Sequence, residues 1–393
     1  MPDPLILPGG KPGRTSHGFT LAELLVTISI IAILASMVLG ALFASQEAAR
    51  RRRTEVTVRK IHDMIALRWE QYQTRRLPIN IGDFNRTDYV NDFINTLAPN
   101  VYDNFEYLDS NPTDPNGEAE FIAAIKLLAL RELMRMELPD HYSDVNPTQF
   151  TPVFLQKWDF NTNQLEPVMP ALQRAYLARI SQLIDPSNPD LDTLPKVFNR
   201  IEQGHESAEC LYMILTTGNL GSDDGNLISD RDVADTDGDG MPEIVDAWGN
   251  PIEWIRWPAG FVSDMQPLVP DPTGGGGLVR DPIAERDPFD PRGLDRKYDA
   301  TEPRGYRLFP LIVSAGPNES FSLAFRWNPE GDLRRHDPYA LLEDSPSSFQ
   351  DIDRQRGDVE PRLQAGIIGG AAQRLEFDGT ELDNIHNHLF ASP

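Results

Sequence analysis

A run of acidic residues near the middle of the chain has the spacing of a calcium-binding loop. Counted from Asp235, side-chain oxygens stand at positions 1, 3, 5, 9 and 12, and glycine stands at position 6. Alternating carboxylates of this kind surround a hard cation, a backbone carbonyl at position 7 adds a ligand, and the glycine permits the sharp turn. The sequence therefore predicts a Ca²⁺ site made by Asp235, Asp237, Asp239, Met241, Glu243 and Asp246, with Gly240 at the turn.

A solvated acidic turn is the alternative interpretation of this loop. Position 12 is Asp246, whose side chain is shorter than the usual bidentate glutamate, and no helix pattern frames the loop. A bound ion would stabilise the fold in place of a disulfide, since Cys210 is the single cysteine of the chain. We expect Cys210 to be a buried structural thiol.

A lone carboxylate, Glu23, stands at the start of the longest apolar run. The 21 residues from Leu24 to Ala44 carry no charge. As a helix they would span about 31 Å, close to the ~30 Å hydrocarbon core of a bilayer. The run is longer than the apolar region of a cleaved signal peptide. The sequence thus predicts a membrane-spanning helix, and an ionised Glu23 there costs about 3 kcal/mol unless a partner neutralises it.

Gly18, Phe19 and Glu23 resemble the N-terminus of type IV pilin and pseudopilin precursors, which have a short polar leader, glycine before phenylalanine, and glutamate at the fifth mature position. The resemblance implies that prepilin peptidase cuts between Gly18 and Phe19 and that the new Phe19 amine is N-methylated. It also implies that Glu23 pairs with the Phe19 amine of a neighbouring subunit. The residues agree, because a carboxylate at this depth needs a cation. An ordinary signal anchor with a chance glutamate is the alternative.

A second stretch, Asp246 to Pro251, is similar to the Asp-x-Trp-Gly-Asn-Pro turn of the major, G-type pseudopilins of type II secretion. Later positions resemble that family's calcium loop, although Asn318 stands where the family has aspartate. The resemblance implies that Asn318 and Asp383 are further metal ligands. It also implies a secretion pseudopilus whose partners are prepilin peptidase, other pseudopilin subunits in a homo-oligomeric filament, the inner-membrane secretion platform and membrane lipid.

The resemblance further implies a single-pass protein of the bacterial inner membrane, with the N-terminus in the cytoplasm and the head in the periplasm. The positive charges alone favour the opposite orientation, because four arginines follow the apolar run at residues 50–53. The processing site is the more specific feature, so we expect the periplasmic head. The arginines then form a solvated helix face or contact anionic headgroups.

The expected fold is α+β and pilin-like, with a long N-terminal helix packed on a small antiparallel sheet and with a helical insertion. We expect a leader at 1–18, a helix at 19–76 that spans the membrane at about 19–44, a helical insertion at 77–218, and an acidic, β-rich region at 219–393. The apolar spacing favours helices at 118–137, 169–184 and 196–217 and strands at 252–257 and 305–314. Beyond the membrane, a buried helix stripe is expected at Val58, Ile61, Ile65, Trp69 and Tyr72.

The net charge of −24 argues against nucleic acid as a partner, because the chain would repel a phosphate backbone. No Gly-x-Ser-x-Gly, phosphate-loop or His-Glu-x-x-His pattern occurs in the sequence, so we do not expect an enzyme.

Two other functions stay open beside the secretion pseudopilin. One is a type IV pilin or minor pilin for adhesion or motility, and the other is a membrane-tethered calcium-binding module.

Overall fold

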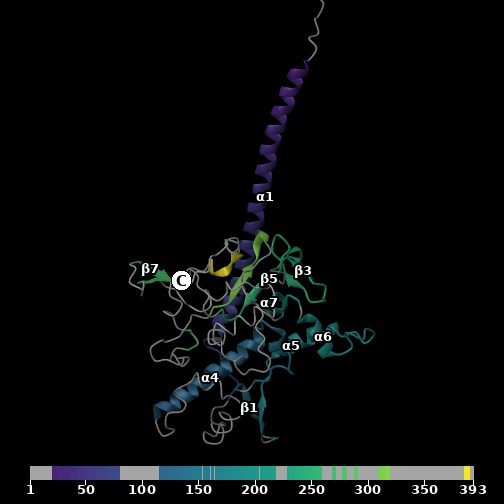
Figure 1. Ribbon diagram of the computed structural model, residues 1–393. Coiled ribbons are helices and arrows are strands. Elements are labelled where there is room, and N and C mark those ends of the chain that lie inside the picture. Colours follow the sequence, from purple (N-terminus) through teal and green to yellow (C-terminus); the bar gives the residue numbers. More distant parts are fainter. Residues whose placement is uncertain are drawn as a thin grey trace, which may run out of the picture. The chain divides into compact units, whose positions relative to one another are not determined.

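Helices and short antiparallel strands make up the described part of the chain, as seen in the computed structural model (Figure 1). The described residues are 20–79, 115–152, 154–159, 161–162, 164–202, 204–217, 228–258, 268–270, 277–280, 287–290, 309–318 and 385–389. Gly18, Phe19 and Asp383 lie outside them. The chain divides into one unit of residues 1–50 and a second of residues 51–393, called the head below.

The element order confirms the α+β class. The helices are α1 (Leu21–Gln71), α4 (Pro115–Glu137), α5 (Ala171–Ile180), α6 (Leu194–Ile201) and α7 (Glu206–Thr216). The strands are β1 (Gln156–Asp159), β2 (Gln164–Pro167), β3 (Val233–Ala234), β4 (Glu243–Ile244), β5 (Ile252–Ile255), β6 (Leu268–Pro270), β7 (Leu278–Arg280), β8 (Leu311–Ser314) and β9 (Ile385–His386). Single 3₁₀ turns lie at η3 (Tyr142–Asp144), η4 (Ser181–Leu183), η5 (Asp230–Asp232), η6 (Gly316–Asn318) and η9 (Asn387–Leu389).

Two elements differ from the expectation. The helix expected at 196–217 is interrupted, and α6 and α7 are separate helices with Gly204 between them. The hairpin of β1 and β2 was not foreseen, because its short strands carry charged and amide side chains rather than an alternating apolar pattern.

The head contains one three-stranded antiparallel sheet, in the order β5-β8-β9. Ile252 pairs with Ser314 and Ile255 with Leu311, while Ser314 also pairs with Ile385 on the other side. Helix α7 packs against β5 and β4 (Figure 1). Beside this sheet the described residues contain the short hairpins β1-β2, β3-β4 and β6-β7 and an isolated antiparallel bridge between Val245 and Pro251.

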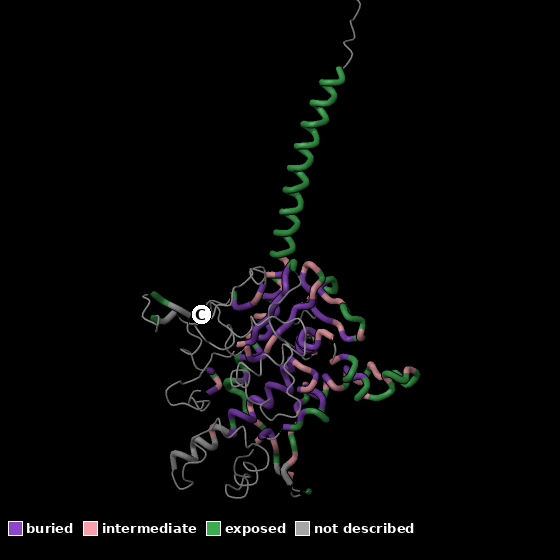
Figure 2. The backbone as a smooth tube through the Cα atoms, viewed as in Figure 1, coloured by how far each residue is buried: buried purple, intermediate pink, exposed green. Residues whose placement is uncertain are grey.

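Helix α1 changes character along its length. Residues 20–50 are exposed throughout, whereas the stripe expected in its outer part is buried (Figure 2). Val58, Ile61 and Ile65 have no exposed surface, and Trp69 and Tyr72 are 2 % exposed. These side chains join a single core with residues of α4, α5, α7 and the central sheet. Residues 115–217, expected as an insertion, therefore share the core on which the outer part of α1 rests.

We expect Ile65→Ala to lower the free energy of unfolding by about 2–5 kcal/mol, because it leaves a cavity in this core. Leu67→Ala is the matched control on the same helix, since Leu67 is 49 % exposed and its truncation should cost well under about 1 kcal/mol. Denaturant unfolding of the full chain in detergent measures both changes. Equal effects of the two variants would contradict the assignment of the buried stripe.

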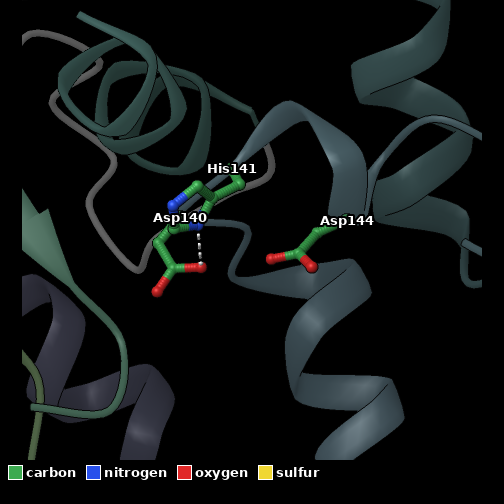
Figure 3. A group of neighbouring side chains, drawn as sticks. All are labelled: Asp140, His141 and Asp144. Carbon is green, nitrogen blue, oxygen red and sulfur yellow. Dashed lines mark hydrogen bonds and ion pairs between the residues drawn. The ribbon is translucent and has the colours of Figure 1, made fainter. Parts of the chain in front are cut away.

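The core also holds a network of buried charges next to the end of α4. The Asp140 carboxylate contacts the His141 ring, at 3.0 Å, and lies near Asp144 (Figure 3). Arg256 pairs with Asp140 at 2.9 Å and with Asp144 at 2.8 Å, and Arg135 Nε donates to Asp144 at 2.7 Å. Burial alone would raise the pKa of Asp140, but Arg256 and His141 outweigh burial and lower it. Burial lowers the pKa of His141, but Asp140 outweighs it and raises that pKa to about 9.

We expect the charged His141 to stabilise the head below pH 6.5 and to lose this contribution as the pH rises through about 9. The direction follows because the folded pKa lies above the unfolded value of about 6.5, and the effect is on the order of 2–3 kcal/mol. Urea unfolding of the full chain in detergent, from pH 5.5 to 9.5, should show a smaller loss of stability for His141→Gln than for the unmodified chain. The difference between the two curves cancels other groups that titrate in this range, so identical curves would refute the ion pair.

Candidate functional site

The acidic loop predicted from the sequence connects two short paired strands. Val233 of β3 pairs with Ile244 of β4, and Ala234 pairs with Glu243. Residues 235–242 thus form the tip of a hairpin. Gly240 has φ 101°, a left-handed conformation that residues with a side chain rarely adopt, in agreement with the turn expected there.

Side-chain oxygens hold the loop in shape. Asp235 accepts hydrogen bonds from the backbone N–H groups of Gly238, at 2.7 Å, and Gly240, at 3.1 Å. Asp239 Oδ1 accepts one from the N–H of Met241, at 2.7 Å, while the Met241 side chain lies in the core. The loop is therefore ordered by its own aspartates, with carboxylates already turned inward.

The structure brings most of the predicted ligands together and adds one that the sequence reasoning missed. Ligand atoms of Asp235, Asp237 and Asp239 lie within 4.8 Å of one another. Asp237 also belongs to a second group with the same spacing, formed with Glu243 and with Glu209 of α7. Glu209 stands in the first turn of α7, directly before the apolar run that begins with the buried Cys210. Its position beside that run was the sequence feature that could have indicated a buried carboxylate.

Burial dominates the electrostatics of this cluster. It raises the pKa of Glu209 to about 10, against the hydrogen bond from Tyr142. It raises the pKa of Glu243 to about 7 and that of Asp239 to about 6, in both cases against a backbone hydrogen bond and with further upward shifts from neighbouring aspartates. The ionised forms of these carboxylates are thus destabilised, as expected for like charges that share a desolvated site.

Asp246, expected as the position-12 ligand, belongs to neither group. Its Oδ1 accepts hydrogen bonds from the N–H groups of Trp248, at 2.8 Å, and Asn250, at 3.0 Å. Its Oδ2 accepts one from Ser314 Oγ, at 2.7 Å. Both oxygens are used within a turn, so Asp246 joins the 246–251 turn to β8.

The turn at residues 246–251 also contacts α1. Ala247 N–H donates to Thr54 Oγ1 at 3.0 Å, and Asn250 Nδ2 donates to the Gly316 carbonyl oxygen at 2.8 Å. Gly316 opens η6, which ends at Asn318, the residue expected to be a further ligand. Asn318 is therefore placed after β8, and its proposed partner Asp383 lies outside the described residues.

A third group of possible ligands, Asp140, His141 and Asp144, is a charge network rather than a metal site. Arg135 and Arg256 already neutralise its carboxylates, and the raised pKa of His141 keeps the ring protonated and unable to coordinate.

At the N-terminal end, Glu23 caps its own helix. Helix α1 begins at Leu21, so Thr20 is the N-cap and Glu23 the third helical residue. Glu23 Oε2 accepts from Thr20 N–H at 2.9 Å, and Thr20 Oγ1 accepts from Glu23 N–H at 3.2 Å. This is a capping box, which the sequence Thr-x-x-Glu could have indicated. The Glu23 carboxylate is exposed in the single chain and accessible to a cation from another molecule.

Helix α1 is also the one helix among the described residues that is long and apolar enough to cross a membrane. A family model, the prokaryotic N-terminal methylation motif, matches residues 13–39, which include Gly18, Phe19 and Glu23. No curated protein and no solved structure matches the chain. The chain therefore carries a prepilin-type N-terminal methylation motif on a membrane-capable helix, and this motif supports a place in the type IV pilin-like family of structural, non-enzymatic proteins.

Proposed function

We propose that the chain is a structural pseudopilin, cleaved by prepilin peptidase, N-methylated at Phe19 and assembled into a type II secretion pseudopilus for protein export. The observation that carries the proposal is the methylation motif at residues 13–39, which contains Gly18, Phe19 and Glu23 and continues into α1. The proposed location is the bacterial inner membrane, with a cytoplasmic leader and a periplasmic head.

The exposed first half of α1 supports assembly. Its apolar side chains are mostly more than half exposed, including Ile31, Met37 and Phe43. A surface of this extent needs an apolar surrounding. The bilayer supplies one before assembly, and the same helices of neighbouring subunits supply one in a filament.

The secretion machine is favoured over an adhesive pilus by two features of the head. Many type IV pilins close a C-terminal loop with a disulfide, whereas this chain has only Cys210, which is buried. The 246–251 turn, similar to that of major pseudopilins, joins α1 to the central sheet. Deletion of the gene separates the two functions: loss of exported proteins supports the pseudopilus, and loss of surface fibres with normal export supports the pilus.

The mass and N-terminal residue of the protein extracted from membranes test the processing step. A chain that begins at methylated Phe19 is the expected result. A chain that begins at Met1 in cells with active prepilin peptidase would overturn the proposal.

For assembly, we expect Glu23→Gln to reduce filament incorporation at least about tenfold. Glutamine retains the oxygen that accepts from Thr20 N–H and so preserves the capping box, but it removes the charge that would pair with a neighbour's Phe19 amine. Thr20→Ala is the matched control, because it weakens the cap by about 1 kcal/mol and keeps the charge. Incorporation is measured by crosslinking and pelleting of filaments, with the processed N-terminus verified by mass.

Glu23→Ala should behave as Glu23→Gln does. If Glu23→Gln assembled normally while Thr20→Ala failed, the capping box rather than the charge would be what assembly requires, and the pairing with Phe19 would be wrong.

A further inference from the structure

Two groups of carboxylates share Asp237 at the tip of the β3-β4 hairpin. The outer group adds Asp235 and Asp239 from the loop itself, and the inner group adds Glu243 of β4 and Glu209 of α7. The inner group therefore joins two parts of the chain that are far apart in sequence.

Both glutamates of the inner group are fully buried and incompletely hydrogen-bonded. Neither Glu209 nor Glu243 has exposed surface, and Oε1 of each lacks a hydrogen-bond partner among the described residues. Their Oε2 atoms are used, since Tyr142 donates its hydroxyl hydrogen to Glu209 and Thr236 N–H donates to Glu243 at 2.9 Å. Each buried glutamate thus keeps one carboxylate oxygen without a hydrogen-bond partner among the described residues, and Glu209 Oε1 lies on the side of Gly204 that also faces Asp237 Oδ2.

The described residues supply no ion pair for these carboxylates. Two basic side chains lie nearby, but both have other partners. Arg200 donates to the carbonyl oxygen of Gly238 at 2.6 Å, and the His205 ring pairs with Glu253 at 3.1 Å. A buried carboxylate without a compensating charge is costly by several kcal/mol. No basic side chain among the described residues is paired with these carboxylates, and a cation bound from solvent would offset their charge.

We propose that Glu209, Asp237 and Glu243 bind one Ca²⁺ ion, which fastens α7 to the β3-β4 hairpin. Asp235 and Asp239 shape the loop around the ion through their backbone hydrogen bonds. Asp237 is exposed and gives the ion a path from solvent.

The donor set favours a hard cation, and Ca²⁺ suits a site built mainly from protein carboxylates better than Mg²⁺ does, because Mg²⁺ usually keeps several of its waters. All the side-chain donors are carboxylate oxygens, whereas Zn²⁺ prefers sites with histidine or cysteine. Ligand atoms on opposite sides of an ion are separated by twice the bond length, about 4.8 Å for Ca²⁺ and about 4.2 Å for Mg²⁺. Ligand atoms of the inner group lie within 4.8 Å of one another, a spacing that a single bound cation can bridge.

Gly204 makes the approach of the two segments possible. A Cβ atom at this position would lie 1.6 Å from Asp237 Oδ2 and 3.4 Å from Glu209 Oε1. The N–H of His205, the next residue, donates to the same Asp237 oxygen at 3.1 Å. The break between α6 and α7 thus forms one wall of the cation site, and any larger residue at 204 would displace the Asp237 carboxylate.

Glu209 therefore takes the part that the sequence assigned to Asp246. The longer glutamate arm arrives from α7 rather than from position 12 of the loop, because the oxygens of Asp246 are occupied by Trp248, Asn250 and Ser314. The site is a property of the head and does not depend on processing or assembly.

The test is calorimetric titration of CaCl₂ into the full chain, purified in detergent and stripped with EDTA. We expect one Ca²⁺ per chain and a rise in Tm of about 5 °C or more at a concentration roughly 100 times Kd. Glu209→Gln should weaken the affinity at least about tenfold. MgCl₂ titrated in the same way should bind more weakly than CaCl₂.

Glu206→Gln is the matched control, because Glu206 is a buried carboxylate one turn earlier on α7 and belongs to neither group. The Glu206→Gln variant should bind Ca²⁺ with an affinity within about twofold of that of the unmodified chain. Gly204→Ala provides a second test that leaves the charge unchanged, and it too should weaken binding.

Three results would overturn the proposal. One is the absence of both heat and a Tm shift in the unmodified chain. Another is full affinity in Glu209→Gln together with loss of binding in Asp235→Asn, which would place the ion in the outer group alone. If Glu209→Gln does not fold, unchanged affinity in Gly204→Ala decides against the inner group.

Discussion

A charge buried in a protein must be neutralised within a few ångströms, and this constraint organises the head. Where the chain supplies both signs, the charges are paired: Arg256 lies between Asp140 and Asp144, and Glu137 accepts from Tyr72 and Arg75. These pairs connect the end of α4 and the residues after it to the turn that follows α1 and to the segment after β5. At the inner group of α7 and β4, by contrast, the described residues offer no ion pair to the two buried carboxylates. The contrast between the two clusters, rather than acidity itself, separates a structural network from a ligand site.

Helix α1 faces a different constraint, because one continuous helix serves two surroundings. Its first part is apolar on all sides, which suits lipid or neighbouring helices, whereas its outer part is apolar along one stripe and rests on the core of the head. Specific hydrogen bonds also hold the outer part of α1 to the head. Thr54 accepts from the 246–251 turn, and Arg68 Nη1 donates to the carbonyl oxygen of Ile214 in α7. Helix, turn and sheet are thus linked by polar contacts as well as by packing.

The buried stripe of α1 and the shape of the acidic loop were predictable from hydrophobic periodicity and from the local spacing of residues. The stripe from Val58 to Tyr72 follows the helix repeat, and the alternating aspartates with Gly240 fix the loop by contacts within a few residues. What could not be predicted depends on contacts between distant segments. Asp246 has the right spacing for a ligand, but Ser314 and its own turn take up its oxygens. Glu209 lies 26 residues before Asp235 and reaches the loop only because Gly204 allows a close approach.

An ion in the inner group would differ from an arginine in one physical respect. An arginine is part of the chain, so its contribution to stability does not depend on any concentration. The stabilisation from a bound ion grows with the concentration of free ion relative to Kd. Helix α7, which contributes Glu209, also packs on β5 and accepts the hydrogen bond from Arg68 of α1 through Ile214. An ion that holds α7 to the β3-β4 hairpin therefore stabilises the surface on which the outer part of α1 rests. In a chain whose single cysteine excludes an internal disulfide, such an ion would link these two segments in a disulfide's place.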